Sequence, residues 1–137
     1  MPKAKELNVQ LEDRPGTLGK FCQSLADRGV NILAFQATTT GGKGVVRLVA
    51  DSPTAAKTTI EAQGLKCNES DIAQVSLPNR PGEVARAASQ LGSANINIEY
   101  GYTGVDPTGK ATFFFGVTDV DKAVEILDRA SAGAARG

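Results

Sequence analysis

The chain contains one sequence pattern twice, and this repeat limits the folds that it can adopt. The tripeptide Arg-Pro-Gly at 14–16 recurs at 80–82, a spacing of 66 residues. The same spacing pairs Leu25 with Leu91, Asn31 with Asn97, and Ile32 with Ile98. In the second half of each copy the spacing becomes 67, pairing Gly42 with Gly109 and Ala56 with Ala123, which one inserted loop residue explains. A repeat of this length predicts two copies of one structural module, within residues 1–70 and 71–137.

Each copy is predicted to begin with a strand, a turn and a helix. Residues 6–11 alternate apolar and polar side chains, as a half-buried strand does, and residues 72–77 are their less regular counterpart. Pro and Gly then end the strand. The following helix places apolar side chains at i, i+3, i+4 and i+7. These positions are Leu18, Phe21, Cys22 and Leu25 in the first copy and Val84, Ala87, Ala88 and Leu91 in the second.

The rest of each copy is predicted to be two strands and a second helix. Gly29 suits a helix C-terminus, glycines at 41–42 indicate a hairpin, and residues 45–50 form a strand matched by 112–117. Ser52 and Asp119 are signals of a helix N-terminus. A fourth strand at 65–69 closes the first copy. In the second copy this strand is missing, because residues 131–137 are rich in Gly and Ala and predict a frayed end.

This βαββαβ order predicts ferredoxin-like α+β modules, each an antiparallel sheet with helices on one face. A module of about 65 residues is marginally stable alone, so the two copies are expected to share a sheet or a helix face. The second module, without its last strand, would keep an unpaired edge. A homodimer that covers this edge is therefore expected.

The composition excludes several classes of function. The chain has no histidine, which removes Ser-His-Asp and Cys-His nucleophiles and most zinc-hydrolase chemistry; no metal site and no cofactor are predicted. Lys plus Arg and Asp plus Glu number 15 each, a balance that does not favour binding to nucleic acid or to a membrane. Because the sequence has no signal peptide and no apolar run of about 18 residues, a cytoplasmic protein is expected.

The two turns and the segments around them resemble the ACT domain family. In the first copy Asp-Arg-Pro-Gly-Thr-Leu at 13–18 precedes a helix, and Gly-Val-Asn-Ile at 29–32 precedes a strand. The second copy has Asn-Arg-Pro-Gly-Glu-Val at 79–84 and Ala-Asn-Ile-Asn-Ile at 94–98. The resemblance covers about residues 6–130 and implies a free-standing tandem ACT protein. It further implies sensory modules that hold amino acids or related small ligands at interfaces and regulate a partner enzyme.

Each Arg-Pro-Gly turn is a candidate binding site for a carboxylate. Glycine lets a ligand approach the backbone, and the helix N-terminus supplies unpaired N–H groups and partial positive charge. An asparagine at the start of the second strand can both donate to and accept from an amino acid. Alternatively, the turns and the asparagines are purely structural. The predicted ligand-binding residues are Asp13, Arg14, Gly16, Thr17, Leu18 and Asn31 in the first copy and Asn79, Gly82, Glu83 and Asn97 in the second.

Glu83 distinguishes the two candidate sites, because its counterpart in the first copy is Thr17. A carboxylate in the first helical turn interacts favourably with the helix dipole but repels a carboxylate ligand. The site of the first copy is therefore expected to be the functional one.

Two further motifs are explained without a ligand. Residues 104–111 nearly match a phosphate-binding loop, but Ala111 stands where Ser or Thr would bind magnesium, and a strand follows where the motif needs a helix. The run Phe113 to Phe115 is interpreted as a strand buried on both faces and not as a base-stacking surface.

The leading hypothesis is a cytoplasmic regulatory protein whose modules bind an amino acid and thereby alter a partner. One alternative is a ligand-free interaction subunit that assembles with a partner enzyme. The other is an enzyme on a ferredoxin-like dimer, which lacks support because the sequence has no histidine and no carboxylate pair at a plausible spacing.

Overall fold

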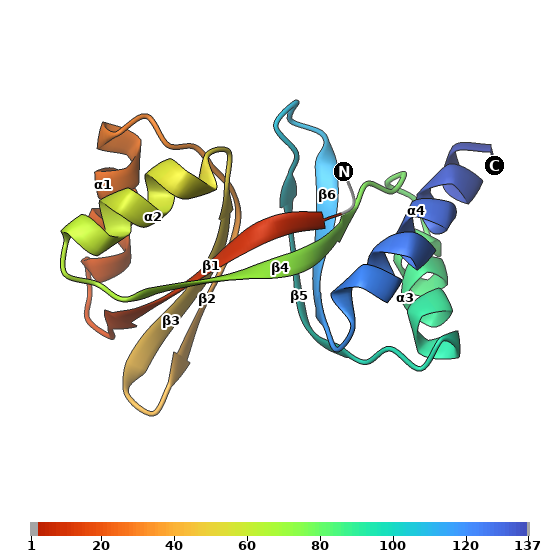
Figure 1. Cartoon of the computed structure of the whole chain (residues 1–137), viewed down its shortest axis with the longest axis horizontal. Helices are drawn as coiled ribbons and strands as arrows, with labels where there is room; N and C mark the ends of the chain where they lie inside the picture. The colour runs from red at the N-terminus through yellow and green to blue at the C-terminus, as the bar shows by residue number, and fades with distance from the viewer. Residues whose placement is uncertain (1–2, 137) are drawn as a thin grey trace. The chain divides into compact units, whose positions relative to one another are not determined.

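The computed structural model describes residues 3–136, with side chains as far as Ser131. This part of the chain has α+β content, with four helices and antiparallel strand pairing. It divides into two compact units, which we call the first module (residues 5–70) and the second module (residues 71–136 with residues 3–4). In chain order, the elements are β1 (Lys3–Glu12), α1 (Thr17–Asp27), β2 (Ile32–Thr40), β3 (Lys43–Ala50), α2 (Pro53–Ala62), β4 (Cys67–Val75), α3 (Glu83–Ser93), β5 (Ile98–Val105), β6 (Ala111–Val117) and α4 (Val120–Arg136), as labelled in Figure 1.

The sheet of the first module has β3 between β1 and β2, and both pairings are antiparallel. Leu7 lies opposite Leu48, and Val9 lies opposite Val46, so one face of the sheet is apolar. Helices α1 and α2 cover this face (Figure 1). The buried core residues are Leu7, Val9, Leu11, Phe21, Leu25, Val30, Val46, Leu48, Ala50, Ala56, Ile60 and Cys67.

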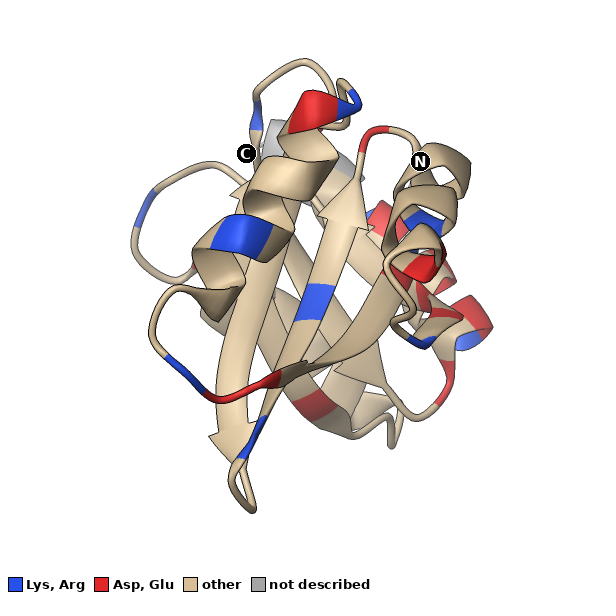
Figure 2. Cartoon of the chain, turned by 90° about the vertical axis from the view of Figure 1, so that its left-hand side faces the viewer, with Lys and Arg blue, Asp and Glu red and all other residues tan. Residues whose placement is uncertain are grey.

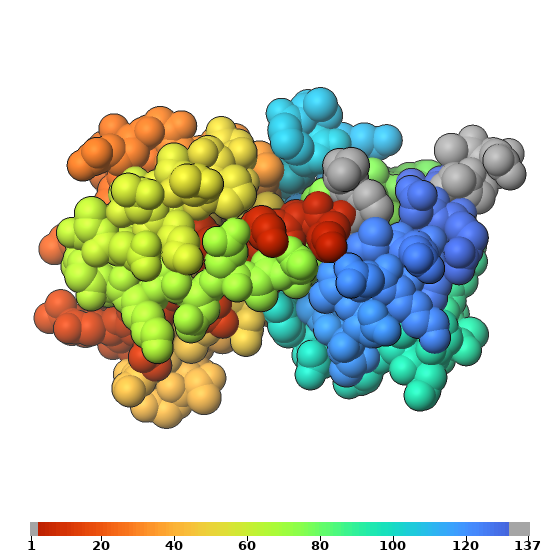
Figure 3. All heavy atoms as spheres, in the orientation of Figure 1, coloured from red at the N-terminus to blue at the C-terminus, as the bar shows by residue number. Residues whose placement is uncertain are grey.

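The second module repeats this arrangement, with β6 between β4 and β5. Helices α3 and α4 pack together and cover the sheet, and the space-filling view in Figure 3 shows α4 on the surface of this module. Its core contains Ala73, Val75, Leu77, Ala87, Leu91, Ile96, Phe115, Val117, Ala123, Ile126 and Leu127. Phe21 and Leu25 of the first predicted stripe and Ala87 and Leu91 of the second are buried in two separate cores. Val84 is 42% exposed, so its predicted place on the apolar stripe of α3 was wrong.

The structure corrects the strands expected between the modules. Two strands, at 65–69 and 72–77, are predicted from the sequence, whereas β4 is one continuous strand from Cys67 to Val75. Residues 68–71 contain no Gly or Pro that would interrupt it. One strand therefore completes the first copy of the pattern and begins the second.

The end of the chain also differs from the prediction. Residues 131–136 continue α4, which the structure extends to Arg136, so the expectation of a frayed end at these positions was wrong. Alanine has the highest helix propensity, and Ala-rich sequence can continue a helix that is already nucleated. Gly137 lies outside the described residues, and no strand follows α4 within residues 3–136.

The helix ends confirm the local signals in the sequence. At the C-terminus of α1, Gly29 has a φ of 71°, and the Val30 amide donates to the Leu25 carbonyl at 3.0 Å. The Ser52 hydroxyl caps α2 by accepting from the Ala55 amide at 3.4 Å. These are ordinary helix stop and start signals, determined by residues close in sequence.

The hairpin and the Phe run have the predicted structural roles. The Asp106 carboxylate accepts from the Thr108 and Lys110 amides at 2.9 Å each and so fixes the loop between β5 and β6. Phe114 and Phe115 lie on opposite faces of β6 and are both buried. The Tyr102 ring stacks on Phe114 with 5.6 Å between ring centroids. Among the described residues, no helix is long and apolar enough to cross a membrane.

Candidate ligand-binding site

The two Arg-Pro-Gly turns have nearly identical backbones. In the first module the Thr17 amide donates to the Arg14 carbonyl at 3.2 Å, and Gly16 has a φ of 88° and a ψ of −16°. In the second module Gly82 has a φ of 89° and a ψ of −11°. Proline followed by glycine at such angles is a type II β-turn. The glycine is therefore required first by the backbone conformation, whatever else approaches it.

The first helix begins without a side-chain cap. Gly16 occupies the N-cap position and offers no side chain, while its carbonyl accepts from the Lys20 amide at 3.1 Å. Within residues 3–136, the Leu18 and Gly19 amides have no hydrogen-bond partner. Unpaired amides and the helix dipole together make this end of α1 favourable for an anion.

A cavity of about 510 Å³ lies beside this helix end, in the size range typical of ligand pockets. Its lining combines apolar side chains with neutral polar and charged ones. The cavity is lined by Leu11, Glu12, Arg14, Pro15, Gly16, Thr17, Lys20, Phe21, Gln63 and Leu65. This combination fits a small molecule with a charged head and an apolar side chain.

Both signs of charge are present at this cavity. Arg14 Nη2 lies 2.7 Å from Glu12 Oε2, and the two side chains are 73% and 69% exposed. An ion pair this exposed contributes little to stability and exchanges partners readily. The Lys20 ammonium has no ion-pair partner in the described part of the chain. Figure 2, which faces the first module, shows basic and acidic positions interspersed on this side.

In the second module the position equivalent to Thr17, at the start of the helix, carries a carboxylate of the chain itself. Glu83, the first residue of α3, is only 7% exposed. Its Oε1 accepts from Arg80 Nε and its Oε2 from Arg86 Nη2, each at 3.0 Å. These hydrogen bonds, that of Arg86 foremost, hold the pKa of Glu83 below its ordinary value. The charge is thus satisfied on both oxygens.

The other predicted residues are divided between the turn and the far end of the helix. Asp13 and Leu18 line a second hollow of about 190 Å³ beside the first turn. Asn31 and Asn97 do not join the turns, because each follows the C-terminus of its helix, about 16 Å from the N-terminus for an 11-residue helix. Their backbone amides are bound by Asp51 Oδ1 at 3.0 Å and Thr118 Oγ1 at 3.2 Å.

Asn79 is exposed and lies just before the second turn, where the Arg80 amide donates to the Pro78 carbonyl at 3.0 Å. The first turn has the same hydrogen bond, from Arg14 to Glu12. Asp13 and Asn79 are thus the central residues of matching tight turns.

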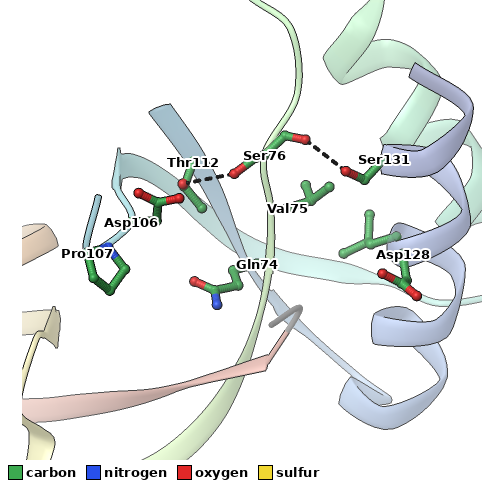
Figure 4. Close-up of a pocket in the computed structure, with 9 residues that line it drawn as sticks. Gln74, Val75, Ser76, Asp106, Pro107, Thr112, Asp128 and Ser131 are labelled. Carbon is green, nitrogen blue, oxygen red and sulfur yellow. Dashed lines mark hydrogen bonds between the residues drawn. The ribbon is translucent and has the colours of Figure 1, made fainter. Parts of the chain in front are cut away.

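A cavity of about 240 Å³ in the second module has different chemistry (Figure 4). Ser76 Oγ lies 3.3 Å from Thr112 Oγ1, and Ser131 Oγ donates to the Ser76 carbonyl at 3.2 Å. The charged residues that line it are Asp106 and Asp128, with no Lys or Arg among the described residues. Two carboxylates without a cation disfavour a carboxylate ligand. The cavity at the first turn is therefore the better candidate.

Sequence reasoning missed Lys20, Arg86 and Glu12. The signal for the first two was available, because Lys20 and Arg86 are 66 residues apart and keep a cation three residues after Thr17 and Glu83. Glu12 could not be found from the repeat, since its counterpart is Pro78.

Two repeated modules, each with an Arg-Pro-Gly turn at a helix N-terminus, define a tandem α+β protein. The sequence matches the family model described as an ACT domain pair over residues 3–131. The chain belongs to the ACT domain pair family. A comparison with curated protein sequences gives no match.

Solved structures share this fold. A protein from Bacteroides thetaiotaomicron superposes with a TM-score of 0.83 at 26% identity, covering 93% of this chain and 88% of that chain. The regulatory subunit of aspartate kinase from Thermus thermophilus, in its ligand-free form, gives a TM-score of 0.66 at 19% identity, covering 97% and 92%. The corresponding subunit from Thermus flavus gives 0.62 at 19% identity, covering 95% and 93%.

Proposed function

We propose that this protein is a non-catalytic regulator that binds an amino acid at the Arg-Pro-Gly turn of its first module. One observation carries the proposal: the uncapped N-terminus of α1 adjoins a cavity of about 510 Å³ that cations and apolar side chains line together. The free amides, Arg14 and Lys20 suit a carboxylate, and Glu12 suits an ammonium group. Leu11, Phe21 and Leu65 suit an apolar side chain.

Membership in the ACT domain pair family supports a sensory role. Two of the structures with this fold are regulatory subunits of aspartate kinase, and this chain covers more than nine-tenths of each of them. We infer that the ligand alters an interaction with a partner enzyme, and that the protein forms a homodimer. Light scattering tests the second inference: a particle of twice 14.2 kDa is expected, and a mass of one chain would contradict it.

A thermal-shift screen against the twenty amino acids, each at millimolar concentration, tests the ligand. A ligand present at 100 times its Kd that binds only the folded state adds about 2.7 kcal/mol, which raises the midpoint by several degrees. One or a few amino acids are expected to give this shift. A flat response to all twenty would overturn the amino-acid proposal and favour the ligand-free interaction subunit, which would then be sought by co-purification with a partner.

A further inference from the structure

We propose that Glu83 is a built-in occupant of an anion site, and that the equivalent position of the first module binds the carboxylate of an external ligand between Arg14 and Lys20. The inference rests on the proposed function, because it names the group by which the first module holds its ligand. It goes further in predicting one open and one closed site in each chain.

The second module shows how the turn holds a carboxylate. Arg80 precedes Glu83 by three residues and Arg86 follows it by three, and each binds one carboxylate oxygen at 3.0 Å. The side chain of Glu83 is 9% exposed, whereas those of Arg80 and Arg86 are 47% and 32% exposed, so the two hydrogen bonds are partly buried. Charge-assisted hydrogen bonds from two guanidinium groups are among the stronger polar interactions in proteins. A carboxylate at the start of α3 also interacts favourably with the helix dipole.

The first module has cations at the same two positions, with lysine in place of the second arginine, and no carboxylate between them. Arg14 and Lys20 occupy the positions of Arg80 and Arg86, at the same spacing around Thr17. Thr17 is shorter than glutamate and carries no charge, and its neighbourhood is the cavity of about 510 Å³. The backbone of the turn is the same in both modules, with φ values of 88° and 89° at the two glycines. The structure thus contains a filled and an open version of one arrangement.

The position of Glu12 strengthens this comparison. In the first module Arg14 contacts Glu12, a surface pair that a ligand carboxylate can replace at little cost. The second module has Pro78 at the position of Glu12, so Arg80 has no such neighbour and turns to Glu83. Replacing Glu83 by an external ligand would require breaking two partly buried, charge-assisted hydrogen bonds, which makes this site unfavourable for a ligand.

The test uses sodium acetate as the minimal carboxylate, followed by two-dimensional NMR of the 15N-labelled full chain. Sodium chloride at the same ionic strength is the reference. In the wild type, acetate is expected to cause saturable shifts of the Leu18 and Gly19 amides and none at Val84 or Ala85. Glu83→Thr is expected to add saturable shifts at Val84 and Ala85. Thr17→Glu is expected to weaken acetate binding at α1 at least tenfold, because the new carboxylate occupies the position.

The matched control is Thr54→Glu, which adds the same charge to the first turn of α2. It is expected to leave acetate binding at α1 within about twofold of wild type, since charges separated by a Debye length are largely screened at moderate salt. Should Thr17→Glu fail to give a folded spectrum, Lys20→Ala replaces it and is expected to weaken acetate binding several-fold.

Three results would overturn the proposal: no saturable acetate shift at α1, unchanged affinity in both Thr17→Glu and Lys20→Ala, or no new shifts in Glu83→Thr. Its failure is distinguishable from failure of the proposed function. An amino acid that stabilises the wild type and Thr17→Glu equally leaves the sensor proposal standing but moves its site. If acetate binds at α1 but no amino acid raises the unfolding midpoint, the anion-site proposal is supported and the proposal that the ligand is an amino acid is contradicted.

Discussion

The two modules share one backbone turn and use it with opposite chemistry. Neither helix has a side-chain cap, but the turn at Gly16 adjoins a cavity, whereas beside the turn at Gly82 the carboxylate of Glu83 is bound by two arginines. The difference arises from two positions, Glu12 against Pro78 and Thr17 against Glu83. A duplicated module can therefore keep its fold in both copies while the charged groups beside the turn differ, because turn geometry depends on Pro and Gly and the local chemistry depends on their neighbours.

The modules also differ in how they fill one position of the sheet. In the first, Ala34 lies opposite Val49; in the second, Tyr100 lies opposite Gly116 at the equivalent pair. A Cβ added at Gly116 would lie 2.1 Å from the Tyr100 ring. The small residue has thus changed strands between copies, since close packing conserves the volume of the pair and not its individual members.

The largest predicted effect tests this exchange. Gly116→Ala is expected to destabilise the chain by about 3 kcal/mol, because the Tyr100 ring must move out of a packed position. Urea denaturation followed by circular dichroism measures the loss. Adding Tyr100→Ala to the same chain is expected to recover more than half of it. Equal free energies of unfolding for Gly116→Ala and the wild type would contradict the conclusion that the small residue at this pair is required by packing.

The next effect compares the two turn glycines. Gly16→Ala and Gly82→Ala are each expected to cost about 1–2 kcal/mol, the penalty of a left-handed backbone for a residue with a Cβ. The two losses should agree closely, since the φ values are 88° and 89° and no atom lies within 4 Å of either added Cβ. Urea denaturation measures both. A markedly larger loss at one turn would show that packing, and not backbone conformation, requires that glycine.

A smaller effect is expected in the dependence of folding stability on pH, to which the second turn contributes through Glu83. The pKa of Glu83 is lowered on folding by Arg86 and Arg80, so its contribution is present above its unfolded pKa, near 4.5, and is lost as the pH falls through the lowered folded value. Glu83→Gln is expected to flatten the stability profile measured by urea denaturation below pH 4.5.

Thr17→Glu serves as the converse of this experiment. If Arg14 and Lys20 bind the new carboxylate as Arg80 and Arg86 bind Glu83, this variant is expected to gain stability at neutral pH that is lost as the pH falls below the ordinary glutamate pKa. For the preceding variant, Glu83→Gln, a plot of stability against pH that is parallel to that of the wild type would show that the ion pairs of Glu83 do not affect folding.

The smallest effect is expected at the helix C-termini. Gly29 and Asn95 occupy equivalent left-handed positions, with φ values of 71° and 61°. Asn95→Gly is expected to change the free energy of unfolding by no more than about 0.5 kcal/mol, whereas Gly29→Ala costs about 1 kcal/mol. Thermal unfolding measures both. A large loss in Asn95→Gly would reveal a role for the Asn95 side chain beyond the helix end.

Much of the fold follows from local sequence. The type and order of the elements were predicted because apolar periodicity and turn residues act over a few positions, as at Leu18, Phe21 and Leu25 for α1. The continuity of β4 and the length of α4 were missed. Residues 68–71 carry no Gly or Pro signal in either direction, whereas the Gly in 131–136 suggested an end that the helix does not have there; tertiary contacts also influence where such elements end.

The candidate site shows the same division. The repeat identified both turns, and it indicated that Glu83 alters the second one. Lys20 and Arg86 were missed although the repeat pairs them, because a charged helix residue is most often simply solvated and its spacing alone does not indicate which group it binds.

The sequence by itself determined the repeat, the two type II turns and the apolar faces, since each depends on backbone sterics or on burial within one element. Only the tertiary structure decided that Arg80 and Arg86 meet on the carboxylate of Glu83, and that Arg14 pairs with Glu12 beside an open cavity. The physical reason is that long charged side chains have many rotamers of similar energy. Their choice of partner depends on which opposite charge the fold brings within reach.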